Sequence, residues 1–322
     1  MTTESQSSPS GYTWPVLIAF ACVYIFWGST YTAIKVGTEL LPAFLLTGVR
    51  FLISGTFMLL YCRIRGLRIF VGAENLAWLA LLGFLMLGIG NFALVWSEKW
   101  MPSGLAALIV AIVPLYVALL GLMLPGGERL RSRGWFGLLL GFGGLFVLLW
   151  PSMHGAAPGR SSQIAGAGML LCGALAWAIG SLLSRRLKLP VDVLVAAGWE
   201  MLFAGIMNAS VATARAEWPQ AHWNRASILS IAYLVTFGSW VGFTAYIYLL
   251  EHVPVPKVAT YAYVNPVVAV ILGAIILGER LTLTEYLGMI AVVIAVALVT
   301  SSQMQSGKPV AELECVAVEG EG

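Results

Sequence analysis

Two charged residues, Arg50 and Glu200, lie well inside long apolar stretches of the sequence. A charged side chain at the centre of a membrane-spanning helix costs about 2.5–3.5 kcal/mol on insertion scales, so each residue needs a partner or a water-filled cavity. Two interpretations are open. Either the residues face a cavity, where they bind a solute or Glu200 carries a proton, or they form a buried ion pair or local caps on backbone carbonyls.

Aromatic and amide side chains form a second group of candidates. Trp27 and Tyr31 are four residues apart, as are Tyr261 and Asn265, so each pair shares one face of a helix. Such faces are typical of a cavity for an amphipathic organic solute, or of helix packing and an interfacial aromatic belt. Trp240, Thr244 and Tyr248 form a further stripe with a spacing of four residues, and its first two members are included among the cavity candidates. The predicted cavity residues are Trp27, Tyr31, Arg50, Asn91, Trp177, Glu200, Trp240, Thr244, Tyr261 and Asn265.

Long apolar segments must position these side chains. Of the 322 residues, 59% are hydrophobic and 10% are charged, whereas a soluble domain carries about 25% charged residues. Only helices satisfy every backbone group in lipid over segments of about 20 residues, so we expect an all-α membrane protein with ten transmembrane helices. Their approximate ranges are 15–34, 43–62, 75–96, 104–124, 134–150, 164–183, 192–213, 228–250, 258–277 and 284–301. The net charge of +3 gives no indication of a nucleic-acid partner.

Residues about 150 positions apart match one another. Trp27 falls on Trp177, and the triplet Glu-Arg-Leu at 128–130 falls on the same triplet at 279–281. Each half holds five spans, and an odd number forces the second half to enter the membrane from the opposite side. We therefore predict two inverted five-helix repeats. Further matched pairs are Cys22 with Cys172, Arg50 with Glu200, Pro102 with Pro254, and Pro114 with Pro266.

The paired prolines, Pro114 and Pro266, lie inside predicted spans. Proline has no backbone N–H, so each frees a carbonyl group that a neighbour or cavity water must satisfy. The pair predicts either a helix kink beside a transport path or a static packing kink.

The predicted organisation follows from these ranges. We expect a cytoplasmic N-terminal segment (1–14), a first repeat (15–150), an external linker (151–163), a second repeat (164–301) and a disordered cytoplasmic tail (302–322). Eleven Lys and Arg residues fall on the side of the termini and six on the other side, which favours cytoplasmic termini. Charged residues at the outer span ends are expected to be solvated, with a gate as the alternative; they are Lys35, Glu39, Glu98 and Lys99.

Two stretches resemble a known family. The sequence WGSTYTAIKVG with a later Pro and GVRF (27–51), and the run EHVPVPKVATYAYVNPVVAVILGAIILGERLT (251–282), are similar to the drug/metabolite transporter superfamily, specifically its EamA-domain branch. The resemblance covers about residues 15–301. It implies two inverted EamA repeats, both termini inside and a central cavity between the halves. It also implies export of amino acids, related metabolites or drugs without ATP hydrolysis.

Several chemistries are not indicated by the sequence. It contains no GxxxxGK[ST] phosphate loop, no HExxH and no GxSxG motif, so we expect no ATP site, no catalytic residues, no metal and no cofactor. The predicted function is a secondary transporter of the cell inner membrane that works by alternating access. Its predicted partners are a small organic solute and membrane lipids, with protons as a candidate coupling ion. The alternative is a passive facilitator or channel for small organic solutes.

Overall fold

The computed structural model describes residues 13–123, 132–154 and 160–306 of the chain. Within these ranges nine helices are long and apolar enough to cross a membrane. They span Trp14–Leu40, Ala43–Ile64, Ala73–Glu98, Ser103–Met123, Ser132–Trp150, Ser161–Leu187, Val193–Ala214, Arg225–His252 and Leu283–Ser302. A shorter apolar helix, Val264–Leu277, lies within the ninth predicted span. The predicted all-α membrane fold is confirmed.

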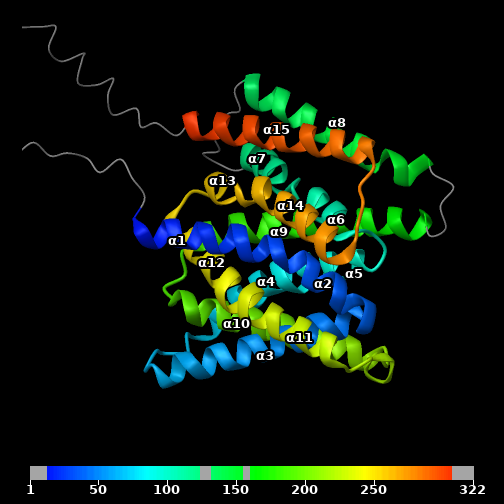
Figure 1. Ribbon diagram of the computed structural model, residues 1–322. Coiled ribbons are helices and arrows are strands. Elements are labelled where there is room, and N and C mark those ends of the chain that lie inside the picture. The colour runs from blue at the N-terminus through cyan, green and yellow to red at the C-terminus, as the bar shows by residue number, and fades with distance from the viewer. Residues whose placement is uncertain (1–12, 124–131, 155–159, 307–322) are drawn as a thin grey trace, which may run out of the picture.

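Several spans consist of more than one helical element (Figure 1). The α-helices are α1 (Trp14–Cys22), α2 (Gly28–Leu40), α3 (Ala43–Ile64), α4 (Ala73–Gly83), α5 (Phe92–Glu98), α6 (Ser103–Val110), α7 (Val113–Met123), α8 (Ser132–His154), α9 (Arg160–Leu187), α10 (Val193–Ala214), α11 (Arg225–Tyr233), α12 (Thr244–His252), α13 (Val255–Val258), α14 (Tyr261–Leu272) and α15 (Leu283–Ser306). Wider π-helical turns join several of them, over Val23–Trp27, Phe84–Asn91, Leu234–Phe243 and Gly273–Leu277.

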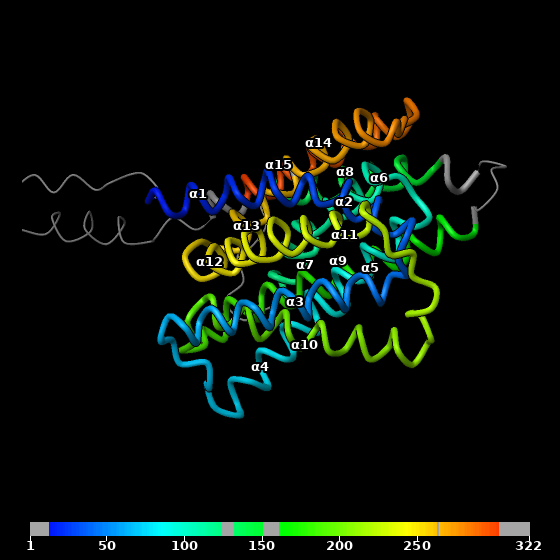
Figure 2. Tube along the Cα trace, turned by 60° about the horizontal axis from the view of Figure 1, so that its bottom comes forward, coloured from blue at the N-terminus to red at the C-terminus, as the bar shows by residue number. Residues whose placement is uncertain are grey.

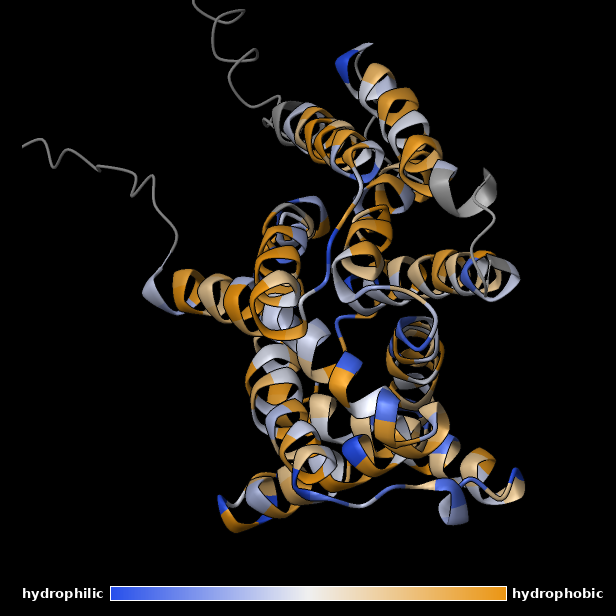
Figure 3. Cartoon of the chain, turned by 45° about the vertical axis from the view of Figure 1, so that its right-hand side comes forward, coloured by the Kyte–Doolittle hydropathy of each residue, from blue (hydrophilic) through white to orange (hydrophobic). Residues whose placement is uncertain are grey.

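The two halves enter the bundle from opposite sides. In Figures 1 and 2, α1 begins and α15 ends at one face of the bundle, here called the terminal face, whereas α9 begins at the opposite face. Five spans precede α9 and five spans start with it, so the second half is inverted relative to the first. Hydrophobic residues predominate along the helices, which Figure 3 colours mostly orange by residue hydropathy.

Helices α3 and α10 pack closely along a row of glycines from both helices. An added Cβ atom at Gly55 would lie 2.4 Å from the backbone N of Leu202, and one at Gly205 would lie 2.4 Å from the backbone N of Leu52. Small residues allow such close backbone approach, which drives helix association in lipid. The glycine seam comprises Gly48, Gly55, Gly198 and Gly205, and its members correspond in pairs at the 150-residue repeat offset.

Substitution Gly205→Ala is expected to lower the thermal midpoint of the purified protein in detergent, because the new methyl group meets backbone rather than a movable side chain. Overpacking of this kind costs about 1–3 kcal/mol. The matched control is Gly143→Ala on α8, since an added Cβ there has no atom within 4 Å. Equal midpoints for the two variants would contradict the close packing of α3 on α10.

The fourth and ninth spans are both interrupted. Helix α6 ends at Val110 and α7 begins at Val113, so Pro114 is the second residue of α7 and its missing N–H is not needed there. In the second half, α13 ends at Val258 and α14 begins at Tyr261, while Pro266 lies inside α14. The interruption therefore precedes each proline, by a few residues in α7 and by more than one turn in α14.

Candidate functional site

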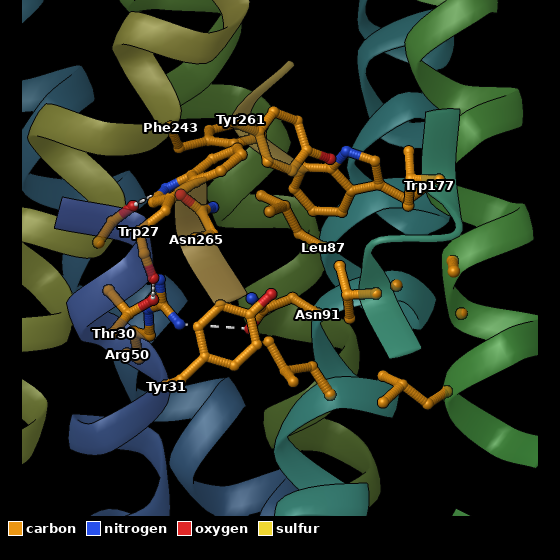
Figure 4. A pocket seen from close by; sticks show the side chains of 18 of the residues that line it. Trp27, Thr30, Tyr31, Arg50, Leu87, Asn91, Trp177, Phe243, Tyr261 and Asn265 are labelled. Carbon is orange, nitrogen blue, oxygen red and sulfur yellow. Dashed lines mark hydrogen bonds between the residues drawn. The ribbon is translucent and has the colours of Figure 1, made fainter. Parts of the chain in front are cut away.

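A cavity lies between the two halves and receives side chains from both (Figure 4). The space between its lining atoms is about 650 Å³, including its open mouth. Each π-helical segment of the third and eighth spans contributes to its wall, through residues such as Asn91 and Gly238. The interrupted helices contribute Val110 and Val113 on either side of the first break, and Tyr261 directly after the second.

Arg50 is the cation of this cavity. Its side chain is only 4% exposed, and its Nε donates a hydrogen bond to Ser239 Oγ at 3.0 Å. Nη1 donates to Asn91 Oδ1 at 3.3 Å, as the dashed line in Figure 4 shows. The guanidinium also lies 4.7 Å from the centre of the Phe51 ring. No described carboxylate lies within 4.0 Å of the guanidinium, so its charge has polar neighbours and no counter-ion.

Glycine at position 238 makes room for the guanidinium. An added Cβ there would lie 2.7 Å from Arg50 Nη2 and 3.0 Å from the Thr30 methyl group. The backbone carbonyl of Gly238 also accepts a hydrogen bond from Trp27 Nε1 at 3.0 Å. The π-helical turn of the eighth span therefore holds both the arginine and the neighbouring tryptophan in place.

Four aromatic side chains form one end of the cavity, here called the aromatic floor: Trp27, Trp177, Tyr246 and Tyr261. The Trp27 ring lies 5.5 Å from Trp177, 4.9 Å from Tyr246 and 5.5 Å from Tyr261, between ring centroids. The Tyr246 hydroxyl accepts a hydrogen bond from Trp177 Nε1 at 3.0 Å and lies 2.6 Å from Ser181 Oγ. These contacts make the floor a packed layer of rings.

A second cavity lies beyond the floor, toward the terminal face. Glu200, Glu251, Arg185 and Lys188 are among its lining residues. The order of contacts along α9 shows the separation, because Trp177 lines the first cavity, Ser181 contacts Tyr246, and Arg185 lines the second cavity. One helical turn separates each of these positions from the next.

The structure brings seven of the ten predicted cavity residues together around the first cavity: Trp27, Tyr31, Arg50, Asn91, Trp177, Tyr261 and Asn265. Glu200 lies in the second cavity, with Oε2 buried and without a hydrogen-bond partner among the described residues. An Arg50–Glu200 ion pair, one of the two interpretations of the sequence, is therefore absent from the described part of the chain.

Trp240 and Thr244 lie away from the first cavity. Trp240 lines a surface groove beside Phe57 and donates a hydrogen bond to the backbone O of Ser54. The stripe was predicted for an uninterrupted α-helix, whereas residues 234–243 are π-helical. The wider turn brings Gly238 and Phe243, which are five residues apart, to the cavity instead. The hydroxyl oxygen of Thr244 is buried without a partner among the described residues.

A carboxylate from the second half holds the start of α6. Glu279 accepts hydrogen bonds from Ser103 N at 2.8 Å and Ser103 Oγ at 2.7 Å. The preceding Gly278 has a left-handed backbone (φ +67°), which turns the chain toward α6. Glu279 thus supplies the helix cap that Pro102 cannot provide. The corresponding triplet at 128–130 lies outside the described residues.

Substitution Glu279→Ala is expected to destabilise the protein by about 1–2 kcal/mol, because the first amides of α6 lose their acceptor. A thermal melt in detergent measures this change. The control, Glu39→Ala, removes an exposed glutamate at the same face, and its midpoint should stay near that of the parent protein. A loss no greater than the control's would contradict the capping role.

The sequence comparison identifies the family from both halves. The EamA-like transporter family matches residues 13–150 and again residues 164–301. The chain belongs to this family. The resemblance of the two stretches to EamA transporters is thereby confirmed, and each family match covers one of the two five-span halves seen in the fold.

Relatives of this EamA transporter include named membrane proteins. The uncharacterized inner membrane transporter YedA of Escherichia coli (strain K12) is 36% identical over 287 residues, covering 89% of this chain and 90% of YedA. A probable amino-acid metabolite efflux pump of the same strain is 25% identical over 290 residues, covering 84% of this chain and 89% of the pump. A solved crystal structure shares the fold with a TM-score of 0.67 at 22% identity, covering 91% of this chain and 99% of that one.

Proposed function

We propose that this EamA transporter is a secondary exporter of small carboxylated organic solutes, with amino acids and related metabolites as the first class to test. The observation that carries the proposal is the Arg50 guanidinium, which faces an aromatic cavity and has no carboxylate counter-ion among the described residues. A buried charge without a partner is unfavourable. A solute carboxylate would supply the missing partner, and guanidinium binds carboxylates through paired, charge-assisted hydrogen bonds.

The rest of the cavity suits the other groups of such a solute. Asn265 is 2% exposed, and its Oδ1 accepts no hydrogen bond from a described residue. It can accept one from a solute amino group. The aromatic floor offers Trp27 and Trp177 rings to an apolar side chain. The name of the efflux pump among the relatives agrees with this solute class.

The two cavities suit alternating access in the inner membrane. The aromatic floor separates a solute cavity from a cavity toward the terminal face, so one packed layer blocks the path between them. Rocking of one inverted repeat against the other would open this layer and close the far side. In our proposal both termini are cytoplasmic, as the Lys and Arg distribution favours, and protons are the coupling ion.

Counterflow in proteoliposomes tests the proposal. Vesicles loaded with unlabelled L-phenylalanine should accumulate labelled L-phenylalanine, and 3-phenylpropionate should compete whereas phenethylamine, which lacks the carboxylate, should not. An imposed pH gradient should then drive accumulation of the label. Indifference to the gradient would favour the alternative, a passive facilitator. Equal competition by phenethylamine would overturn carboxylate recognition.

A further inference from the structure

Glu98 is a buried carboxyl group without a partner. It is the last residue of α5, its exposed fraction is 0%, and neither carboxyl oxygen accepts a hydrogen bond from a described residue. The sequence predicts a solvated residue at this span end, and that prediction is wrong. A buried ionised carboxylate without donors is strongly unfavourable. The geometry is therefore that of a carboxyl group that carries a proton.

The titratable neighbours of Glu98 come from α2 and from the segment that follows Leu277. On α2, Lys35 Nζ donates hydrogen bonds to the backbone oxygens of Glu98 at 2.7 Å and Met101 at 3.2 Å, and not to the carboxyl group. Tyr31, one turn before Lys35, lines the solute cavity. The carboxylate of Glu279 is hydrogen-bonded to the start of α6. Lys35 is therefore the nearby cation that an ionised Glu98 would attract.

The same contact recurs in the second repeat without the buried carboxyl group. Arg185, the match of Lys35 at the 150-residue offset, donates hydrogen bonds to the backbone oxygens of Leu250 and Glu251 at the end of α12. The Glu251 side chain lines the second cavity and its residue is exposed. Each repeat thus ties the end of its third helix to a basic residue of its first helix. At this contact, among the described residues, the first repeat has a fully buried carboxyl group, Glu98, and the second has the exposed Glu251.

We propose that Glu98 is the proton-binding site that couples solute movement to the proton gradient, with Lys35 as its switch. When Glu98 holds a proton, Lys35 binds the backbone carbonyls at the end of α5, as in this structure. When the proton leaves, the carboxylate attracts the Lys35 ammonium away from those carbonyls. Helix α2 carries both Lys35 and the cavity residue Tyr31, so the switch reaches the solute cavity. The coupling role rests on the proposed function.

Transport measurements separate coupling from solute binding. Glu98→Gln keeps the size of the side chain and mimics its protonated form. In proteoliposomes this variant should retain L-phenylalanine counterflow within about twofold, while accumulation driven by an imposed pH gradient falls to the level without a gradient. One matched control is Glu39→Gln, which changes an exposed glutamate at the same face of the bundle as Glu98. The other is Glu200→Gln, which changes the buried glutamate of the second cavity. Normal gradient-driven accumulation by Glu98→Gln, or its loss in Glu200→Gln alone, would overturn the proposal.

Infrared spectroscopy tests the site without any solute. During a pH titration of the full chain in lipid nanodiscs, the carbonyl band of a protonated carboxylic acid should be present in the parent protein and weaker in Glu98→Gln. In Lys35→Met the band should persist to higher pH, because the cation that stabilises the carboxylate is gone. An unchanged band in Glu98→Gln would refute proton binding at Glu98 even if L-phenylalanine proves not to be transported. If only the transport assay fails in the parent protein, the proposed function fails and the proton site stands.

Discussion

Replacement of Arg50 by methionine is expected to reduce transport of carboxylated solutes by about 100-fold or more. Removing one partner of a buried charged pair costs about 3–5 kcal/mol, and 1.4 kcal/mol corresponds to a factor of ten. Arg50→Lys should rescue only part of the activity, because an ammonium group cannot reproduce the planar paired contacts of guanidinium. Initial rates of L-phenylalanine counterflow in proteoliposomes measure both variants.

The control for this prediction is Arg68→Gln, which removes an exposed arginine at the terminal face. It should transport at the parental rate. Arg50→Met should still purify as a monodisperse protein, since a cation without a counter-ion in the described part of the chain contributes little to folding. Parental counterflow by Arg50→Met would show that the guanidinium does not bind solute. Loss of counterflow together with aggregation would show that Arg50 stabilises the fold and does not act through solute binding.

Substitution Tyr246→Ala is expected to allow uncoupled passage of solute through the transporter. The Tyr246 ring is 2% exposed and packs against Trp27 and Trp177 in the aromatic floor. Its removal takes away the contacts with Trp27 and Trp177 and opens the floor by the volume of a phenol ring. Preloaded L-phenylalanine should then leave proteoliposomes at a rate that no longer depends on solute or protons on the other side.

The matched control is Tyr248→Ala on the same helix, where the ring stacks on His252 at 4.0 Å and lines neither cavity. Tyr246→Phe is the milder variant: it keeps the ring, loses the hydrogen bonds with Trp177 and Ser181, and should leak less than Tyr246→Ala. Tight coupling in Tyr246→Ala would show that the floor does not separate the two cavities.

The spans and their inversion were predictable from sequence because lipid imposes a simple rule on length and polarity. The repeat matches Trp27–Trp177 and Arg50–Glu200 also indicated a central site, and residues of the first pair meet in the aromatic floor. The residues of the second pair lie apart, since Arg50 lines the first cavity and Glu200 lines the second. A pattern along the chain shows that two residues correspond, not that they touch.

The remaining errors have identifiable physical causes. Trp240 was placed on the cavity face because a period of 3.6 residues was assumed, and the π-helical turn changes that period. Glu98 was expected in water because charged residues at span ends usually lie there, and here neighbouring helices cover it completely. The burial of Glu98 depends on contacts between helices that are distant in sequence, which no local pattern contains.

The glycine seam has a consequence for the ancestry of the molecule. Gly48 and Gly55 fit only against the backbone of α10, which carries its own two glycines at corresponding positions. In an isolated first repeat, the glycine face of α3 would therefore be exposed to lipid, which packs poorly against it. The surface that fits this glycine strip is that of α10, the corresponding helix of the second repeat, which crosses the bilayer in the opposite direction. A half-length gene product could satisfy this strip by pairing with a second copy inserted in the reverse orientation, and fusion of two such genes would yield the present chain.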